Sequence, residues 1–209
     1  MRLIFVRHGQ SEGNASGVVQ GHLDFGLSEL GCRQAEITAE RLRNENVRRI
    51  LSSPLRRAAE TAQVIADAHG ISVEPEPALM EYDMGTVSGL TGAEIRERHP
   101  EVLAAYARGE RPRFPGEEGR EAFHARVSAV VKVLGQLSRD ETVVAVAHGG
   151  VINAVCGIAL GVDLRRPGLF QVANCSLTEL VTDRQGQFVI LRHNDVCHLD
   201  GLLTRADRG

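Results

Sequence analysis

The chain has 209 residues, of which 43% are hydrophobic and 24% are charged, and its formal net charge at pH 7 is −3. This length and composition predict an ordinary globular protein that buries one sizeable core. The slightly negative charge argues against a protein that binds nucleic acid or that uses a polybasic patch to bind membranes. No apolar run approaches the roughly 18 residues needed to cross a bilayer, so we expect no membrane partner.

The cysteines and the N-terminal residues favour a cytoplasmic protein. Cys32, Cys156, Cys175 and Cys197 show neither a CxxC pair nor the spacing of a disulfide framework, which is typical of reduced thiols. A strand-like run begins at residue 2 and leaves no room for a signal peptide. We therefore expect a cytoplasmic location.

The first third of the chain alternates between strand and helix patterns. Short apolar runs predict strands over 2–6, 48–54 and 71–77. Apolar residues at helical spacing predict helices over 27–43 and 55–68. Ser28 is the expected N-cap of the first helix, and Ser53 followed by Pro54 is the expected start of the second.

Residues 78–120 differ in composition and are rich in Gly, Pro, Glu and Arg. Within them, Thr91 and Glu94 form a capping box ahead of a helical stretch. We interpret this region as a helical lid insertion over one edge of the core. The insertion belongs to a single domain that spans residues 1–209.

The remaining elements determine the predicted fold class. Helices are expected over 119–137 and 151–160, and strands over 142–147, 176–183 and 187–193. The tight RQGQ segment between the last two strands marks a hairpin. Strands that alternate with helices predict an α/β fold, here a three-layer α/β/α sandwich. Its central sheet is expected to be mostly parallel, with one antiparallel edge strand and the helical lid.

Cationic side chains follow several of the predicted strands. Arg7 and His8 come directly after the first strand, and His148 and Gly149 follow the strand over 142–147. Ligands of such folds bind beyond the carboxyl ends of the strands. Arg56 lies in the first turn of a helix, where the macrodipole disfavours a cation unless an anion lies in front of it. Together these residues predict a phosphate-binding site.

Other polar residues are expected to be solvated or structural and not part of the phosphate site. Arg57 is expected to be solvated, as a partner of Glu60 or Glu36. Four histidines, His22, His69, His99 and His124, are treated as structural or surface residues. Of these four, His22 is the one expected to reach a substrate.

The segment RHGQSEGN (7–14) resembles the signature of the histidine phosphatase superfamily, the phosphoglycerate-mutase-like proteins. The family pattern is Arg-His-Gly, Glu or Gln, Ser or Thr, two variable residues and Asn. The similarity continues in the family's order through residues 20–35, 52–62, 80–91, 144–152 and 194–199. It therefore covers nearly the whole chain.

The resemblance implies a catalytic role for five residues. His8 would be the nucleophile that forms a phosphohistidine, and Arg7, Arg56 and His148 would hold the phosphoryl oxygens. Glu81 would protonate the leaving oxygen and then activate water, although Asp83 and Glu76 are carboxylates nearby. No metal or other cofactor is expected, because the arginines supply the positive charge.

The resemblance also implies substrate contacts. Asn14 and the backbone of Gly149 would donate hydrogen bonds to the phosphate, and Tyr82 would form a wall of the pocket. The block that follows the first motif is expected to contact the substrate through Gln20, Gly21 and His22.

Within the family, the sequence favours hydrolysis of a phosphomonoester over mutase activity. Mutases resemble longer chains, whereas the segment between Glu81 and His148 shows no insertion, and residues 193–199 look like the ending of the short phosphatase branch. Glu118 replaces the serine of a Gly-Glu-Ser motif, while Arg126 is retained. Two alternatives stay open: a cofactor-dependent phosphoglycerate mutase, and a non-catalytic phosphate sensor or scaffold. A metal-dependent hydrolase is disfavoured, because the arginines would repel the cation.

The expected partner is a small phosphorylated substrate whose identity the sequence leaves open. Six arginines occur in or next to the lid: Arg96, Arg98, Arg108, Arg111, Arg113 and Arg120. They fit either a second anionic group on the substrate or, as we favour, a solvated surface balanced by glutamates. Homodimers occur in the family, although the sequence shows no interface signature.

Overall fold

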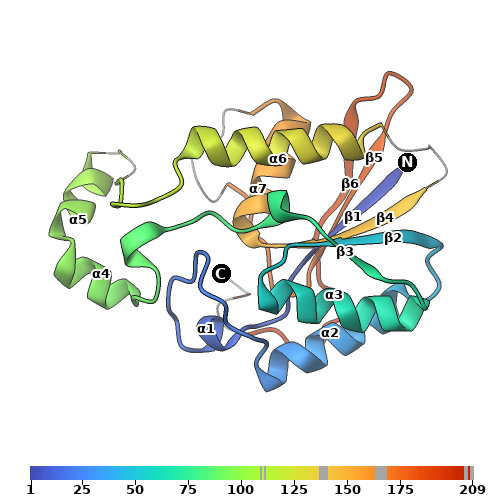
Figure 1. Cartoon of the computed structure of the whole chain (residues 1–209), viewed down its shortest axis with the longest axis horizontal. Helices are drawn as coiled ribbons and strands as arrows, with labels where there is room; N and C mark the ends of the chain where they lie inside the picture. The colour runs from blue at the N-terminus through green and yellow to red at the C-terminus, as the bar shows by residue number, and fades with distance from the viewer. Residues whose placement is uncertain (109, 111, 137–140, 163–168, 205–206, 208–209) are drawn as a thin grey trace.

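The computed structural model describes residues 1–108, 110, 112–136, 141–162, 169–204 and 207 (Figure 1). These residues contain a six-stranded sheet with the strand order β3-β2-β4-β1-β5-β6. Its strands are β1 Arg2–Arg7, β2 Val47–Ser52, β3 Val73–Pro75, β4 Thr142–Ala147, β5 Leu177–Thr182 and β6 Phe188–Asp195.

The strand directions confirm the predicted α/β class. β1 and β2 both pair in parallel with β4, and β2 also pairs in parallel with β3. β5 is antiparallel to both of its neighbours, β1 and β6, so the hairpin adds the antiparallel part at one side of the sheet. Because Arg7 is the register partner of Ala147, the residues that follow β1 and β4 emerge at the same edge.

Helices cover both faces of the sheet (Figure 1). They are α1 Glu12–Ala15, α2 Glu29–Leu42, α3 Arg56–His69, α4 Gly92–Arg98, α5 Pro100–Ala107, α6 Arg120–Leu134 and α7 Gly149–Leu160. One core cluster joins α2 and α3 to the sheet through Ile4, Val6, Val144 and Val146. The other joins α6 and α7 through the alternate strand residues, among them Leu3 and Phe5.

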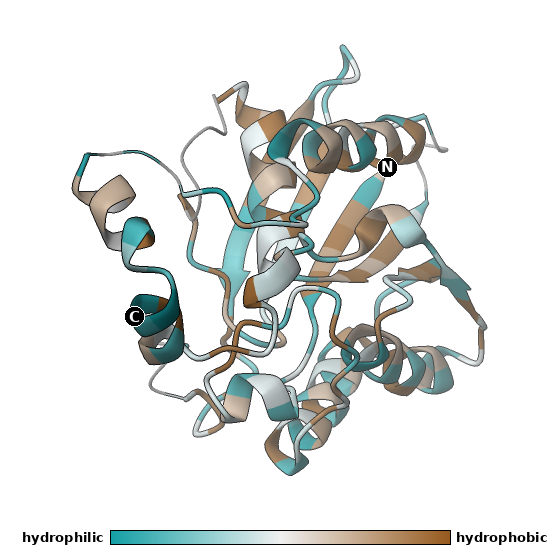
Figure 2. Ribbon diagram, turned by 60° about the vertical axis from the view of Figure 1, so that its left-hand side comes forward, coloured by the Kyte–Doolittle hydropathy of each residue, from teal (hydrophilic) through white to brown (hydrophobic). Residues whose placement is uncertain are grey.

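This alternation explains the composition of the central strands. Successive side chains of a strand point to opposite faces, and both faces of β1 and β4 are covered by helices. Their sequences are consequently apolar throughout, and Figure 2 shows the central strands as mainly hydrophobic beneath helices with one polar side. The buried strands fix the positions of the residues that follow them.

Several predicted element boundaries differ from the structure. Ser28 caps α2 as expected, since its Oγ accepts from the Gly31 N–H over 3.1 Å. The expectation for Ser53 is wrong: α3 begins at Arg56 with Leu55 as N-cap and no side-chain cap. β3 is shorter than predicted and ends at Pro75, because the chain enters a 3₁₀ turn over Pro77–Leu79.

The region 78–120 consists of short elements. They are the 3₁₀ turns η1 Pro77–Leu79 and η2 Gly85–Val87, and the helices α4 and α5. The predicted capping box of Thr91 and Glu94 is present at the start of α4. Figure 1 shows α4 and α5 set to one side of the sheet, where Val87, Val102 and Phe114 form a small apolar cluster of their own.

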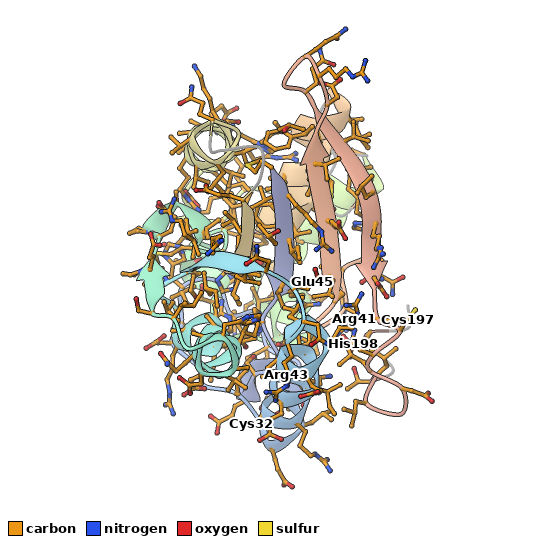
Figure 3. All side chains as sticks on the ribbon, turned by 90° about the vertical axis from the view of Figure 1, so that its right-hand side faces the viewer. Cys32, Arg41, Arg43, Glu45, Cys197 and His198 are labelled. Atoms are coloured by element: carbon orange, nitrogen blue, oxygen red, sulfur yellow. The ribbon has the colours of Figure 1, made fainter. Side chains whose placement is uncertain are left out.

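All four cysteines are free thiols. Cys156 and Cys175 are buried, whereas Cys32 on α2 and Cys197 beyond β6 are exposed on the surface that Figure 3 faces. In the part of the chain that the structure describes, no helix combines the length and the apolar character needed to cross a lipid bilayer.

Candidate active site

A cavity of about 530 Å³ opens at the carboxyl edge of the parallel strands. Eight residues predicted from the sequence line it: Arg7, His8, Asn14, Gln20, Gly21, Glu81, Tyr82 and Gly149. Further polar or small lining residues are Arg57, Arg120, His124, Gly150 and Asn153. Apolar walls come from Val18, Val19, Met84, Phe114, Phe123, Ala154 and Leu169.

His8 is buried at the start of this cavity and is 3% exposed. Its Nδ1 lies 2.7 Å from the carbonyl oxygen of Gly9. Because a carbonyl only accepts, the proton of the neutral ring is assigned to Nδ1, and Nε2 carries the free lone pair. Burial, together with the Arg7 and Arg57 charges, holds the pKa of His8 well below its usual value. The ring is therefore neutral at physiological pH.

His148 lies beside His8, with the two ring centroids 5.1 Å apart. It is fully buried, and its Nε2 lies 2.8 Å from Oγ of Ser53. This contact accounts for the failed N-cap prediction, since the Ser53 hydroxyl meets the histidine. Burial is the main reason why the pKa of His148 is well below the ordinary value, and His8 and the two arginines add to it.

Arg7 extends from the end of β1 along the cavity wall. Its Nη1 donates to the carbonyl of Val172 over 2.5 Å. Burial lowers the pKa of Arg7, and the charges of Asp207 and Glu81 oppose that shift. The guanidinium remains a cation at any pH of interest, and therefore supplies positive charge next to His8.

The structure places Arg57, not Arg56, at the cavity, which corrects both sequence expectations. Arg57 is 1% exposed, and it donates to the carbonyls of Leu23 and Gly21 over 2.8 and 2.9 Å. The Arg56 side chain is 62% exposed and forms a surface ion pair with Glu60 over 2.7 Å. Arg56 is absent from the cavity lining.

Helix geometry explains why Arg57 faces the cavity and Arg56 faces solvent. Adjacent residues of a helix project about 100° apart, so only one of the two can face the cavity. Arg56 shares a side of α3 with Glu60, Gln63 and Asp67, at the spacing of a solvated stripe. Arg57 instead shares its side with buried Thr61, whose Oγ1 accepts from the Gly9 N–H over 3.0 Å. The polar spacing of Arg56, Glu60, Gln63 and Asp67 is the sequence feature that distinguishes Arg56 from Arg57.

Glu81 reaches the cavity from the irregular segment between η1 and η2. Its Oε1 accepts from the N–H of Tyr82 over 2.8 Å, and its Oε2 accepts from the N–H of Gly150 over 3.0 Å. Gly150 is needed for this approach, because a Cβ at that position would lie 2.2 Å from Oε1 of Glu81. The carboxylate is thus held against the first turn of α7.

The remaining predicted contacts differ in their placement. Asn14 closes the capping box of α1 with Ser11 and borders the cavity together with Gln20. His22 does not line the cavity; its Nε2 lies 2.7 Å from the carbonyl oxygen of Glu81. His22 therefore supports the backbone at Glu81. Its expected contact with substrate is not reproduced by the cavity lining.

The α6 side of the cavity contains residues that the sequence prediction assigned elsewhere. Arg120 and His124 are one helical turn apart, and both line the cavity. His124 had been expected to be a structural or surface residue. Arg98 and Arg108 instead pair with Glu94 and Glu110 on the exposed lid, as expected for a solvated surface. Arg111 lies outside the described residues.

Three buried nitrogens at the site point to an anion. Arg7 Nε, Arg57 Nε and His148 Nδ1 are inaccessible and have no hydrogen-bond partner within the protein. Leaving a buried donor unpaired costs about 1–3 kcal/mol. A phosphoryl group supplies several acceptor oxygens and a charge opposite to that of the arginines. Both arginine nitrogens are donors, and Nδ1 of His148 is a donor in the tautomer whose Nε2 accepts from the Ser53 hydroxyl. Two buried guanidinium groups suit a phosphate far better than a cation, and the described residues contain no cluster of three or more His, Cys, Asp or Glu placed to hold a metal.

Fold and site together define an α/β enzyme whose cationic side chains meet at the carboxyl edge of a parallel sheet. The sequence matches the histidine phosphatase superfamily (branch 1) over residues 3–196, and the chain belongs to this superfamily. The family prediction made from the motifs is confirmed.

Similar proteins include phosphatases. The chain is 35% identical over 211 residues to phosphoserine phosphatase 1 of Hydrogenobacter thermophilus, covering 100% of this chain and 99% of that protein. It is 33% identical to the solved structure of a mycobacterial glucosyl-3-phosphoglycerate phosphatase, with a TM-score of 0.81 and coverage of 92% and 98%. It is also 30% identical over 209 residues to a probable phosphoglycerate mutase (GpmB) of Yersinia pestis, covering 96% and 95%. The chain is accordingly an enzyme of the histidine phosphatase type.

Proposed function

We propose that this enzyme hydrolyses a small phosphomonoester in the cytoplasm through a phosphohistidine on His8, without a metal ion. The observation that carries the proposal is the set of unpaired buried nitrogens beside the neutral His8 ring, on Arg7, Arg57 and His148. A neutral imidazole is a nucleophile, and surrounding donors stabilise the charge of the phosphoryl group in transfer.

In the proposed reaction, His8 forms the bond to phosphorus and Glu81 transfers the protons. The lone pair of His8 Nε2 attacks phosphorus, and the bond between phosphorus and the ester oxygen breaks. Protonated Glu81 gives its proton to that oxygen, and the alcohol leaves. Glu81, now ionised, takes a proton from water as the water attacks phosphorus, which breaks the phosphorus–nitrogen bond. The products are the alcohol, inorganic phosphate and the regenerated enzyme.

The mechanism is tested with p-nitrophenyl phosphate and the purified enzyme. Phosphate release should persist in excess EDTA, and His8→Ala should lower kcat by about 10³-fold or more. Quenching during turnover should trap an acid-labile, alkali-stable phosphoenzyme that His8→Ala lacks. Loss of activity with EDTA, or retention of activity in His8→Ala, would contradict the proposal.

The proposed substrate class is a phosphomonoester that also carries a carboxylate. Among the residues that the structure describes, the cavity lining contains three arginines, Arg7, Arg57 and Arg120, and one acidic residue, Glu81. The first two lie beside His8, whereas Arg120 projects from α6 together with His124. Two of the relatives are named for phosphoserine and for a phosphoglycerate derivative, and both compounds carry a carboxylate beside the phosphate ester.

A matched substrate pair tests this class. Phosphoethanolamine is phosphoserine without its carboxylate, and glycerol 3-phosphate lacks the carboxylate of 3-phosphoglycerate. We expect kcat/KM to favour the carboxylated member of at least one pair by about 10-fold or more, the value of one charge-assisted hydrogen bond. Arg120→Ala should remove most of that preference. Equal values of kcat/KM within both pairs would contradict the proposal that the enzyme recognises a carboxylate.

Mutase activity is the second candidate, because a relative at 30% identity is named a probable phosphoglycerate mutase. It is measured as interconversion of 3- and 2-phosphoglycerate in the presence of the bisphosphate. Interconversion that is faster than hydrolysis would replace the hydrolase proposal. A phosphate sensor or scaffold would instead bind inorganic phosphate and release none from any ester.

A further inference from the structure

Arg126 on α6 contacts the segment that carries Glu81. Its Nη1 donates to the carbonyls of Ala78 and Met80 over 2.8 and 2.7 Å. Its Nη2 donates to the carbonyl of Glu81 itself over 2.9 Å. Three carbonyls, one in η1 and two just after it, thus converge on a single guanidinium. A longer helix or a strand would have satisfied them within the backbone.

Glu118 completes the contacts of this guanidinium. Nε of Arg126 donates to its Oε1 over 2.5 Å, and Nη2 donates to its Oε2 over 2.9 Å. All five N–H groups of Arg126 are therefore used, which is the full donor capacity of the side chain. The pair is partly buried, with 21% of the Arg126 side chain and 16% of the Glu118 side chain exposed.

The two residues that precede α6 add further contacts to the same part of the chain. The Glu118 N–H donates to the carbonyl of Asp83 over 3.1 Å, and the Gly119 N–H donates to the Tyr82 hydroxyl over 3.1 Å. Arg126 also lies over the ring of Phe123, 4.8 Å from its centroid. The start of α6 and the backbone around Glu81 consequently behave as one packed unit.

Neither member of the ion pair lines the cavity. We propose that Arg126 and Glu118 are positioning residues that fix the carboxylate of Glu81 for proton transfer to the leaving oxygen. Glu81 meets Gly150 on α7 at its carboxylate and Arg126 on α6 at its carbonyl, so both ends of the residue are fixed. The inference rests on the proposed role of Glu81 as the general acid.

The leaving group distinguishes positioning from a general loss of structure. The alkoxide that leaves from phosphoserine needs a proton, whereas p-nitrophenolate leaves without one. Arg126→Lys keeps the charge but offers at most three donors in place of five. We expect it to lower kcat about 10- to 100-fold with phosphoserine, a large part of what general acid catalysis contributes. With p-nitrophenyl phosphate we expect a loss of less than about threefold, and little change in KM for either substrate.

A double-mutant cycle with Glu81→Gln gives the sharpest test. If Arg126 acts through Glu81, Arg126→Lys should cost nothing further once the acid is gone. Glu118→Gln should show the same selectivity for the alkyl ester with a smaller loss. Arg108→Lys is the matched control, because Arg108 holds Glu110 through the same two nitrogens on the exposed lid, and it should leave both rates unchanged.

The outcomes separate this inference from the proposed function. Additive losses in Glu81→Gln/Arg126→Lys, or equal losses with both esters, would overturn the positioning role while the His8 chemistry stands. Activity that survives in His8→Ala would overturn the proposed function instead. Thermal unfolding of each variant shows whether it folds, and if Arg126→Lys does not fold, the cycle is run with Glu118→Gln.

Discussion

The two sides of the cavity are built in different ways. The sheet-edge wall, which we define as Arg7, His8, Arg57 and His148, comes from the ends of buried strands and one helix. His148 does not itself line the cavity, but its ring lies beside that of His8. His8, Arg57 and His148 are almost entirely buried, whereas Arg7 is partly exposed. The other side, which we call the α6 wall, comes from α6 and from non-helical residues that precede it in the chain. It consists of Tyr82, Phe114, Arg120, Phe123 and His124. Its polar members Arg120 and His124 are partly buried.

This difference separates two tasks of an enzyme. A phosphoryl group is the same in every substrate, so its partners belong on elements that cannot move, and the strand ends provide that rigidity. The rest of the substrate varies between relatives, and irregular segments tolerate variation. Glu81 lies between the two walls, since its carboxylate contacts α7 and its carbonyl contacts α6.

The largest expected effect tests the sheet-edge wall. Arg57→Ala should lower kcat/KM for p-nitrophenyl phosphate by about 10²- to 10³-fold, because a preorganised cationic donor next to the transferred group is lost. Arg56→Ala, one residue away on the same helix turn, should change it by less than about twofold, as for other surface substitutions. Similar losses in both variants, or a larger loss in Arg56→Ala, would contradict the placement of Arg57.

The second largest expected effect tests the contact that holds Glu81 between the two walls. Gly150→Ala would place a Cβ 2.2 Å from Oε1 of Glu81, so we expect the carboxylate to shift and kcat with an alkyl phosphate to fall about 10- to 100-fold. Gly92→Ala at the start of α4 is the control, because its added Cβ would meet Nη1 of Arg96 at 3.6 Å, which is ordinary contact, and Gly92 does not line the cavity. Equal effects of the two alanines would show that Glu81 is not held at this point.

The sequence predicts the sheet-edge wall well for a physical reason. Three of its four residues, Arg7, His8 and His148, lie at the ends of continuous apolar strands, and parallel strands that end at one edge bring them together regardless of loop conformation. The choice of Arg56 over Arg57 failed because the first turn of a helix was considered without its periodicity. The polar spacing from Arg56 to Glu60 contained the correct answer.

The α6 wall could not be predicted in the same way. Residues 78–120 have no long periodic element, so nothing local indicates that Arg126 meets the carbonyls of Ala78, Met80 and Glu81 more than forty residues earlier. Such contacts depend on tertiary packing. The same holds for His124, which was treated as a structural or surface residue although it lines the cavity.

The smallest expected effect concerns the stability of the sheet-edge wall against acid. The folded-state pKa values of His8 and His148 lie well below those of an unfolded chain, because both rings are buried beside cations. As the pH falls below about 6.5, the pKa of histidine in an unfolded chain, the unfolded protein binds protons at these two rings and the folded protein does not. The free energy of unfolding therefore falls with pH, by up to about 1.4 kcal/mol per pH unit for each such histidine.

A single substitution isolates that contribution. His148→Gln removes one of the two proton-binding rings while keeping a polar side chain. Between pH 6.5 and 5, its unfolding free energy from urea titrations should decline less steeply than that of the parent, by up to about 1.4 kcal/mol per pH unit. Carboxylates contribute equally to both proteins, so the difference in slope reports on the ring alone. Parallel pH profiles would mean that His148 takes up its proton in the folded state, and the sheet-edge wall would then be far better hydrated than its burial indicates.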